Sequence, residues 1–409
     1  MKIYEDLVYR GLIKDISSDA LREKLNEGGM TFYIGTDPTA DSMHIGHFSS
    51  FLIASRLKRA GHNPILLIGG ATGLIGDPKP TTERAMISYS DVKRNFDALS
   101  IQAKNIFGFE IVNNYDWSKG INFIDYLRDY GKFFSINYML DKDIIRRRLD
   151  TGITYTEFSY MLMQSLDYET LFREKNVTLQ VAGSDQWGNI TAGIDLIRKK
   201  HNETVYGFTM PLIVDKSGKK FGKTEGNAIW LDKNKTSSYE LYQFLINSAD
   251  DMVIDYLKKL TFLSKEEIDK IEIEHNKAPE NRLAAKTLCK EVITFLHGEE
   301  EYLLAKKISE SLFSENIYSL KAGDIISSLK TINHIEINDS EINLCEFLVD
   351  NKICSSKREA REFISAGAIS INNQKQDNLD FVIKKDIAID NKVILIKKGK
   401  KNYYLGIYN

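Results

Sequence analysis

The sequence predicts an α/β protein in which a parallel-sheet domain is followed by a helical domain and a small α+β domain. Three observations support this fold class. The chain has 409 residues, more than one core usually holds, and its first half alternates short apolar runs with longer amphipathic ones. Residues 237–314 are rich in Leu, Lys and Glu at helical spacing. Roughly the last 70 residues combine a helix-turn-helix pattern with short Ile and Val strands.

The sheet begins with a strand–helix–strand unit. Residues 31–34 (TFYI) and 65–68 (ILLI) are typical of buried strands. Between them, residues 48–60 have helical periodicity and end at Gly61. Such a unit implies a parallel sheet with a right-handed crossover, and therefore a Rossmann-like domain.

Composition shifts along the chain suggest its domain boundaries. We expect a Rossmann-like domain at residues 1–235, with a helical, aromatic insertion at about 113–150 and a basic loop at 216–227. A helical domain (236–314), a polar linker (315–341) and an α+β module (342–409) are expected to follow. Covering helices of the same sheet explain the insertion equally well.

Charge and cysteine content exclude several classes of protein. A formal net charge of −2 is incompatible with a uniformly basic nucleic-acid coat, so any such binding must come from local patches. The three cysteines form no CxxC pair, which argues against a disulfide framework and a cysteine zinc site. The sequence shows no signal peptide and no apolar run near the ~20 residues of a membrane helix. We expect a cytoplasmic protein without a membrane partner.

The stretch DPTADSMHIGH (residues 37–47) follows the first strand and is compatible with a metal site, a capped helix start or a phosphate site. Metal binding is weakly supported, because the two histidines lack Cys, Asp or Glu at ligand spacing. We expect Asp41 or Ser42 to cap a helix that starts near Met43. The first turn, whose N–H groups and dipole attract anions, then contains His44, Gly46 and His47.

Two further stretches carry polar groups at positions suited to a ligand. GGATGLIGDP (residues 69–78) follows the second strand, and its Asp77 is placed to receive an ammonium group. It lacks the terminal Gly-Lys-Ser/Thr of a Walker loop. In the helical pattern of residues 157–172 three polar side chains share one face, namely Tyr160, Gln164 and Asp167. This face either binds a ligand or is an ordinary solvated face of the helix.

Three more segments admit both a functional and an ordinary interpretation. Asp185, just after an apolar run, suits ribose hydroxyls but equally well caps the next helix. The flexible basic loop at residues 216–227 suits polyphosphate contact through Lys223 and Thr224, or is a solvated hairpin. A capped C-terminal helix and residues 397–401 form a basic patch for RNA, or a solvated surface; the helix carries Lys357, Arg358 and Arg361.

Taken together, these motifs resemble the bacterial tyrosyl-tRNA synthetases, a family of class I aminoacyl-tRNA synthetases, along essentially the whole chain. The resemblance rests on Tyr33 with DPTADSMHIGH, and on GGATGLIGDP, NNYDW, YTEFSYMLMQSLD, AGSDQWGN and KFGKT. It implies that ATP and Mg²⁺ are used to activate L-tyrosine, which is then transferred to tRNA(Tyr).

The resemblance also implies a role for individual residues. Those expected to assist catalysis at the phosphates are Thr39, His44, His47, Lys220, Lys223 and Thr224. Those expected to bind tyrosine are Tyr33, Asp77, Tyr160, Gln164, Asp167 and Gln186, with Asn114 behind them. Those expected to bind the rest of ATP are Asp37, Gly46 and Asp185, with Lys223 again.

The sequence departs from the family pattern at two places. Ile34 follows Tyr33 where many relatives have a Cys that reaches the ribose, so this contact is expected to be missing. The loop after Asp77 is about one residue shorter than in many relatives. Arg84 is its expected functional cation, and Lys79 is a candidate to compensate for the missing Lys.

Partners follow from the same resemblance. The C-terminal module resembles the RNA-binding domain named after ribosomal protein S-four and is expected to bind the long variable arm of the tRNA. The acceptor stem is expected near Arg146 and Arg198. A homodimer is expected through the aromatic insertion. Three alternatives remain: a tryptophanyl-tRNA synthetase, which shares fold and signatures, a small-molecule nucleotidylyltransferase, and an inactive RNA-binding paralogue.

Overall fold

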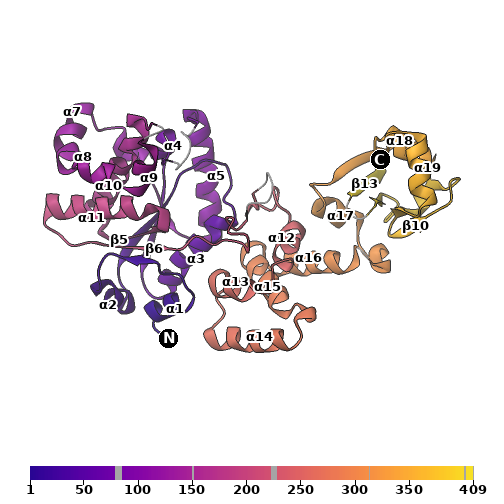
Figure 1. The fold of residues 1–409 in the computed structure, drawn as a ribbon, viewed down its shortest axis with the longest axis horizontal. Helices are drawn as coiled ribbons and strands as arrows, with labels where there is room; N and C mark the ends of the chain where they lie inside the picture. The colour runs from indigo at the N-terminus through magenta and orange to yellow at the C-terminus, as the bar shows by residue number, and fades with distance from the viewer. Residues whose placement is uncertain (79–84, 150–151, 223–227, 313, 400–401, 409) are drawn as a thin grey trace. The chain divides into compact units, whose positions relative to one another are not determined.

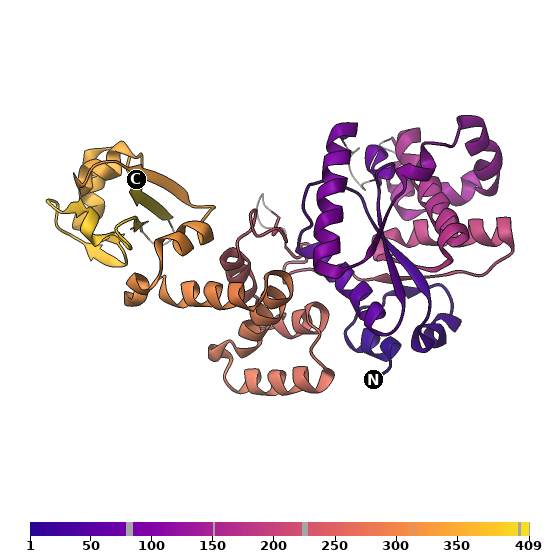
Figure 2. The ribbon, with the colours of Figure 1, turned by 180° about the vertical axis from the view of Figure 1, so that it is seen from behind.

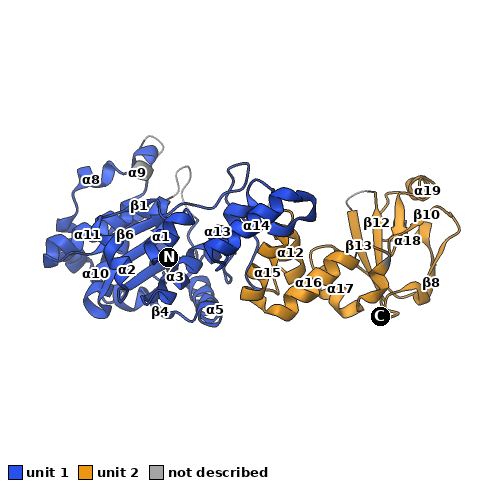
Figure 3. Cartoon of the chain, turned by 90° about the horizontal axis from the view of Figure 1, so that it is seen from below, with its two compact units in different colours: residues 1–232, 249–284 blue, residues 233–248, 285–409 orange. Residues whose placement is uncertain are grey.

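The computed structural model describes residues 1–78, 85–149, 152–222, 228–312, 314–399 and 402–408. The chain divides into two compact units, residues 1–232 with 249–284, and residues 233–248 with 285–409 (Figure 3). None of the helices in these described ranges is long and apolar enough to cross a membrane.

The first unit is built on a sheet in which six strands of the described residues lie in the order β1-β6-β5-β2-β3-β4. Their bounds are β1 (Asp15–Ile16), β2 (Thr31–Thr36), β3 (Asn63–Ile68), β4 (Glu110–Asn113), β5 (Val177–Gly183) and β6 (Tyr206–Met210). All neighbours pair in parallel except the edge strand β1, which confirms the predicted parallel sheet. The chain proceeds outward from β2 in one direction and from β5 in the other. Open α/β sheets bind ligands at such a switch point.

Helices cover both faces of this sheet, with α3 and α5 on one side and α10 and α11 on the other (Figures 1 and 2). The helices of the unit outside the insertion are α1 (Ile3–Tyr9), α2 (Ala20–Glu27), α3 (Ile45–Arg59), α4 (Thr72–Ile75), α5 (Tyr89–Phe107), α10 (Tyr155–Lys175), α11 (Trp187–His201), α13 (Val253–Leu260) and α14 (Lys265–Lys277). The unit β2–α3–β3 confirms the predicted crossover. Strand β3 is buried along nearly its whole length, as a doubly covered parallel strand must be.

The predicted helical insertion consists of short helices between β4 and α10. They are α6 (Tyr115–Ser118), α7 (Phe123–Asp125), η1 (Tyr126–Tyr130), η2 (Gly131–Phe133), α8 (Ile136–Leu140) and α9 (Asp143–Arg148). Its apolar side chains divide into two sets. Met139 is buried against Met161 and Leu162 of α10, whereas Phe123 and Ile136 are mostly exposed to solvent.

The second unit combines helices with a small sheet in the order β10-β9-β12-β13-β7 and a two-stranded ribbon β11-β8. Its helices are α12 (Ser238–Ile246), α15 (Leu283–His297, which begins in the first unit), α16 (Glu299–Ser311), α17 (Ala322–Ser328), α18 (Leu344–Asp350) and α19 (Lys357–Ser365). Its strands are β7 (Asn333–Ile337), β8 (Glu341–Asn343), β9 (Ile369–Ile371), β10 (Gln374–Gln376), β11 (Val382–Lys384), β12 (Val393–Lys398) and β13 (Asn402–Tyr408). The predicted Ile and Val strands correspond to β9 and β12.

Two features differ from the expected domain arrangement. Helices α13 and α14, expected in a separate helical domain, belong to the first unit. The expected linker at residues 315–341 contains α17 and β7, and β7 pairs in parallel with β13. Strand β7 buries only alternate residues, Ile335 and Ile337. Its polar composition therefore resembles that of a linker although it is an edge strand of the sheet.

Candidate active site

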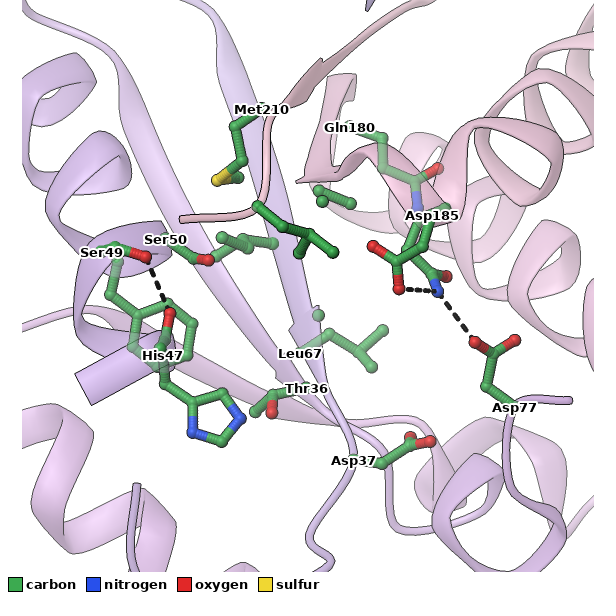
Figure 4. Close-up of a pocket in the computed structure, with 18 of the residues that line it drawn as sticks. Thr36, Asp37, His47, Ser49, Ser50, Leu67, Asp77, Gln180, Asp185 and Met210 are labelled. Carbon is green, nitrogen blue, oxygen red and sulfur yellow. Dashed lines mark hydrogen bonds between the residues drawn. The ribbon is translucent and has the colours of Figure 1, made fainter. Parts of the chain in front are cut away.

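A cavity of about 780 Å³ opens at the carboxyl ends of β2 and β5, in the first unit (Figure 4). This is the switch point of the sheet, where the sequence places its polar motifs. The structure gathers most of the expected site residues along its wall: Tyr33, Asp37, Thr39, His44, Gly46, His47, Asp77, Tyr160, Gln164, Asp167, Asp185, Gln186 and Lys220. Lys223 and Thr224, together with Lys79 and Arg84, lie outside the described residues.

The histidine motif starts helix α3, but its cap differs from the expected one. The helix begins at Ile45 and His44 is its N-cap, so the expectation that Asp41 or Ser42 caps a helix from Met43 is wrong. Gln102 of α5 accepts the N–H of Met43 at 2.8 Å and donates to the Ser42 hydroxyl at 3.1 Å. These contacts hold Ser42 and Met43 outside the helix, so the first helical turn begins only at Ile45.

The two imidazoles form a reciprocal cap. Nδ1 of His44 accepts the N–H of Gly46 at 3.1 Å, and Nδ1 of His47 accepts the N–H of His44 at 3.2 Å. The rings stack with their centres 3.9 Å apart. A Cβ on residue 46 would lie 2.9 Å from the His44 ring, so glycine at this position makes room for the cap.

This cap determines which ring nitrogens carry protons. Because each Nδ1 accepts a backbone N–H, the proton of each neutral ring lies on Nε2. Burial, and secondarily His44, lower the pKa of His47 to about 3, so His47 is neutral at pH 7. The helix start therefore presents neutral N–H donors at the wall of the cavity, which suits an anion such as a phosphate.

Asp37 lies at the acidic side of the cavity. Its carboxylate accepts hydrogen bonds from the Thr72 hydroxyl at 2.8 Å and the Tyr160 hydroxyl at 3.0 Å. A Cβ on Gly69 would lie 2.2 Å from both Asp37 Oδ1 and Thr72 Oγ1, so only glycine lets them meet. Burial, then Asp37 and Asp77, raise the pKa of Tyr160 well above its usual value. This environment favours a cation.

At the buried end of the cavity, Tyr33 and Asp167 are 1% and 2% exposed. The Tyr33 hydroxyl has no hydrogen-bond partner in the part of the chain that the structure describes. The Asp167 carboxylate accepts from Asn114 Nδ2 at 2.9 Å and Trp117 Nε1 at 2.8 Å. Burial raises the pKa of Asp167 to about 7, and these hydrogen bonds oppose the shift. This end of the cavity suits a ligand hydroxyl.

Three residues of the site were not singled out from the sequence. Trp117 belongs to the NNYDW motif but reads as an ordinary core aromatic. Gln180 is a buried polar residue in the mostly apolar strand β5, and its Oε1 has no partner among the described residues. Asn189 donates to Gln164 Oε1 and Gln186 Oε1, both at 3.0 Å. Its i, i+3 spacing from Gln186 on α11 is the signal that was available.

Gln186 connects this polar group to the acidic side of the cavity. Its Nε2 donates to Asp77 Oδ2 at 2.9 Å and, more weakly, to Asp185 at 3.4 Å (Figure 4). Asn189 also approaches Asp77 Oδ1, at 3.4 Å. Asp77, Gln164 and Gln186 are therefore held by one network centred on Asn189.

The five basic residues expected to contact RNA lie on surface helices of both units. Lys357 pairs with Glu346 and Arg358 with Glu362, each at 3.0 Å. Arg361 is exposed on the same helix as Arg358. Two further arginines have nearby carboxylates as partners, Arg146 with Asp141 and Arg198 with Asp195.

Comparisons with known proteins identify the family of this chain. Residues 25–314 match the family described as tRNA synthetases class I (W and Y), and residues 324–406 match the tyrosine--tRNA ligase SYY-like C-terminal domain. The chain is 46% identical to a tyrosine--tRNA ligase of Leuconostoc mesenteroides over 412 residues, covering 99% of both. It is 47% identical to one of Streptococcus pyogenes over 419 residues, covering 100% of both.

Solved structures show the same fold. A C-terminally truncated mitochondrial tyrosyl-tRNA synthetase of Aspergillus nidulans matches with a TM-score of 0.68 at 33% identity, covering 76% of this chain and 94% of that one. A tryptophanyl-tRNA synthetase of Encephalitozoon cuniculi matches at 16% identity with a TM-score of 0.56, over 75% of this chain and 89% of that one, which shows a shared fold alone. The chain therefore belongs to the class I tRNA synthetases (W and Y), and within them to the tyrosine--tRNA ligases.

Proposed function

We propose that this chain activates L-tyrosine with ATP, forming tyrosyl-adenylate and pyrophosphate, and then transfers tyrosine to the 3′ terminal adenosine of tRNA(Tyr). The observation that carries this proposal is the buried, unsatisfied hydroxyl of Tyr33 in the same cavity end as Asp167. A phenol hydroxyl bound there accepts from Tyr33 and donates to Asp167. Phenylalanine would leave the buried Tyr33 hydroxyl without a partner and would offer Asp167 no further donor, which disfavours its binding.

The opposite end of the amino acid requires an acidic surface. Asp77 and Tyr160, which line the cavity, are assigned to its ammonium group, and Asn189 orients Gln164 beside them. Asp77 accepts a hydrogen bond from the Nε2 of Gln186. An incoming ammonium group competes for Asp77 and leaves this amide able to donate to the reacting carboxylate.

ATP is proposed to bind at the start of α3. Thr39 and the N–H donors of His44 and His47 are placed for its phosphates, while Gly46, Asp37 and Asp185 are assigned to the nucleoside side. Lys220, Lys223 and Thr224 are assigned to the departing pyrophosphate. Mg²⁺ is proposed to enter with ATP, because this ion usually binds substrate phosphates and keeps several waters.

The chemistry needs little from the protein beyond position and charge. A carboxylate oxygen of tyrosine attacks the α-phosphorus, a new P–O bond forms, and the bond to the β-phosphate oxygen breaks to release pyrophosphate. The carboxylate is already a nucleophile, so no general base or covalent enzyme intermediate is required. The neutral histidine donors serve this step by stabilising charge that builds on the phosphate oxygens.

Transfer RNA is proposed to bind the basic residues of the surface helices. Lys357, Arg358 and Arg146 each pair with an exposed carboxylate, and Arg198 pairs with the partly buried Asp195. Exposed ion pairs contribute little stability, so a tRNA phosphate displaces the carboxylate at small cost. Arg361 completes the expected surface on α19.

The chain is also proposed to act as a homodimer in the cytoplasm. The insertion exposes large apolar side chains that a monomer would not need on its surface: Phe123, Ile124, Leu127, Ile136 and Tyr138. All three cysteines are buried and free, as a reducing compartment favours.

The test is ATP–pyrophosphate exchange measured separately with tyrosine, phenylalanine and tryptophan. We expect exchange with tyrosine alone, and a loss of 100-fold or more, on the order of 3 kcal/mol, in His44→Ala and Lys223→Ala. Exchange with tryptophan in place of tyrosine would contradict the substrate assignment. Unchanged rates in both variants would contradict the assignment of the phosphate-binding groups.

A further inference from the structure

The described part of the basic loop at residues 216–227 forms a short hairpin with the residues just before it. The N–H of Phe221 donates to the carbonyl of Ile213 at 3.0 Å, and the N–H of Asp215 donates to the carbonyl of Lys219 at 2.8 Å. Between these hydrogen bonds Val214 and Lys220 face each other. The hairpin borders the cavity, because Ile213, Lys220 and Phe221 line it. The position of Lys220 therefore depends on what anchors this hairpin.

Tyr256 of α13 contacts both sides of the hairpin. Its hydroxyl donates to the carbonyl of Val214 at 3.1 Å, on the first side. Its ring lies 4.4 Å from the ring of Phe221, centre to centre, on the second side. Tyr256 and Phe221 are both buried. Burial raises the pKa of Tyr256 to about 12, so the hydroxyl remains a donor at physiological pH.

Helix α13 is itself fixed to α3, the helix that His44 caps. The buried Arg10, which follows α1, donates to the carbonyls of Lys258 at 2.8 Å and Thr261 at 3.4 Å, at the end of α13. Arg56 of α3 donates to the same Thr261 carbonyl. These guanidinium groups satisfy carbonyls that a helix end leaves unpaired. Tyr256 is thus held in a constant position relative to α3.

We propose that Tyr256 is a positioning residue that places Lys220 against the leaving pyrophosphate. This inference rests on the proposed function, in which Lys220 binds that group. When the hydroxyl of Tyr256 is removed, the Val214 carbonyl loses this donor and the hairpin loses one of its contacts with α13. A small displacement of Lys220 affects the step in which pyrophosphate forms and leaves the distant tyrosine pocket unchanged.

The experiment compares Tyr256→Phe, Lys220→Ala and the double variant in tyrosine-dependent ATP–pyrophosphate exchange. The Phe ring keeps the contact with Phe221 and removes only the hydroxyl. We expect kcat to fall about five- to tenfold in Tyr256→Phe, with KM for tyrosine unchanged. In the Lys220→Ala background the same substitution should change kcat less than twofold, because its effect passes through Lys220.

Tyr9→Phe is the matched control. The Tyr9 hydroxyl also joins two elements of the first unit, since it donates to Asp269 at 3.3 Å, but it is not bonded to the hairpin. We expect wild-type exchange from this variant. The inference is overturned if Lys220→Ala lowers exchange and Tyr256→Phe does not, or if the effects of the two substitutions are additive. Absence of tyrosine-dependent exchange in the wild-type chain would instead overturn the proposed function.

Discussion

At the scale of single residues, Asp167 shows how the site balances burial against hydrogen bonding. A buried carboxylate is costly, and the donors Asn114 and Trp117 offset only part of this cost. The pKa of Asp167 therefore stays raised, at about 7, where a free Asp titrates near 4. A ligand hydroxyl supplies a further donor and stabilises the charged form.

This raised pKa makes the stability of the ligand-free protein depend on pH. The folded state binds the Asp167 proton more tightly than the unfolded state, so this group lowers the free energy of unfolding as pH rises from about 4 to about 7. Asp167→Asn removes the titration. The free energy of unfolding of the variant, taken relative to that of wild type, should rise by roughly 3 kcal/mol from pH 5 to pH 8. Urea unfolding of both proteins at the two pH values measures this difference, and an equal difference at both would contradict the assigned pKa.

At the scale of elements, the start of α3 and the end of the hairpin form one assembly. The N–H of Ile45 donates to the carbonyl of Ile229 at 2.9 Å, and the N–H of Ile229 donates to that of Gly222 at 3.0 Å. The N–H of Leu231 donates to the carbonyl of Met43 at 2.8 Å. Segments almost 190 residues apart in sequence thus share backbone hydrogen bonds at the site. The histidine motif at the start of α3 and the described part of the basic loop are therefore positioned together.

Gly222 tests this assembly. Its φ is +84°, and a Cβ there would lie 1.9 Å from Cγ2 of Ile45, the first residue of α3. Gly222→Ala should therefore push α3 and the hairpin apart and lower tyrosine-dependent exchange at least tenfold. Gly218→Ala is the control, since Gly218 also has a positive φ, of +79°, and a Cβ there meets nothing within 4 Å. Equal losses in the two variants would attribute the effect to backbone strain alone.

At the scale of the whole molecule, the exposed apolar side chains of the insertion are the basis for the proposed homodimer. The insertion exposes several large apolar side chains, which are contributed by the consecutive short helices α7 to α8. A solvated surface made of such residues is unfavourable, and association of two copies buries it. The proposed homodimer follows from this surface.

Substitution of Ile136 by Asp should dissociate the dimer, because an unpaired charge would be buried at the interface. Sedimentation velocity over a range of concentrations should show dimers for wild type and monomers for Ile136→Asp. Ile273→Asp, which changes an exposed isoleucine on α14, should remain dimeric. A monomeric wild type, or a dimeric Ile136→Asp, would contradict the proposed interface.

The sequence alone predicted a parallel sheet, its first strand–helix–strand crossover and a set of polar residues that line the cavity. Buried parallel strands are continuous apolar runs, and the polar residues that follow them are visible, as Asp37 after β2 and Asp185 after β5 illustrate. The six motifs also identified the family that the comparisons show.

Only the tertiary structure decided the contacts between segments that are distant in the chain. The capping of α3 by His44 depends on Gln102 of another helix, and the attachment of α13 to the first unit depends on Arg10 and Arg56. Asn189 acquires its importance from side chains on other elements. Hydrophobic periodicity reports which face of an element is buried, but hydrogen bonds between distant segments leave no period in the sequence.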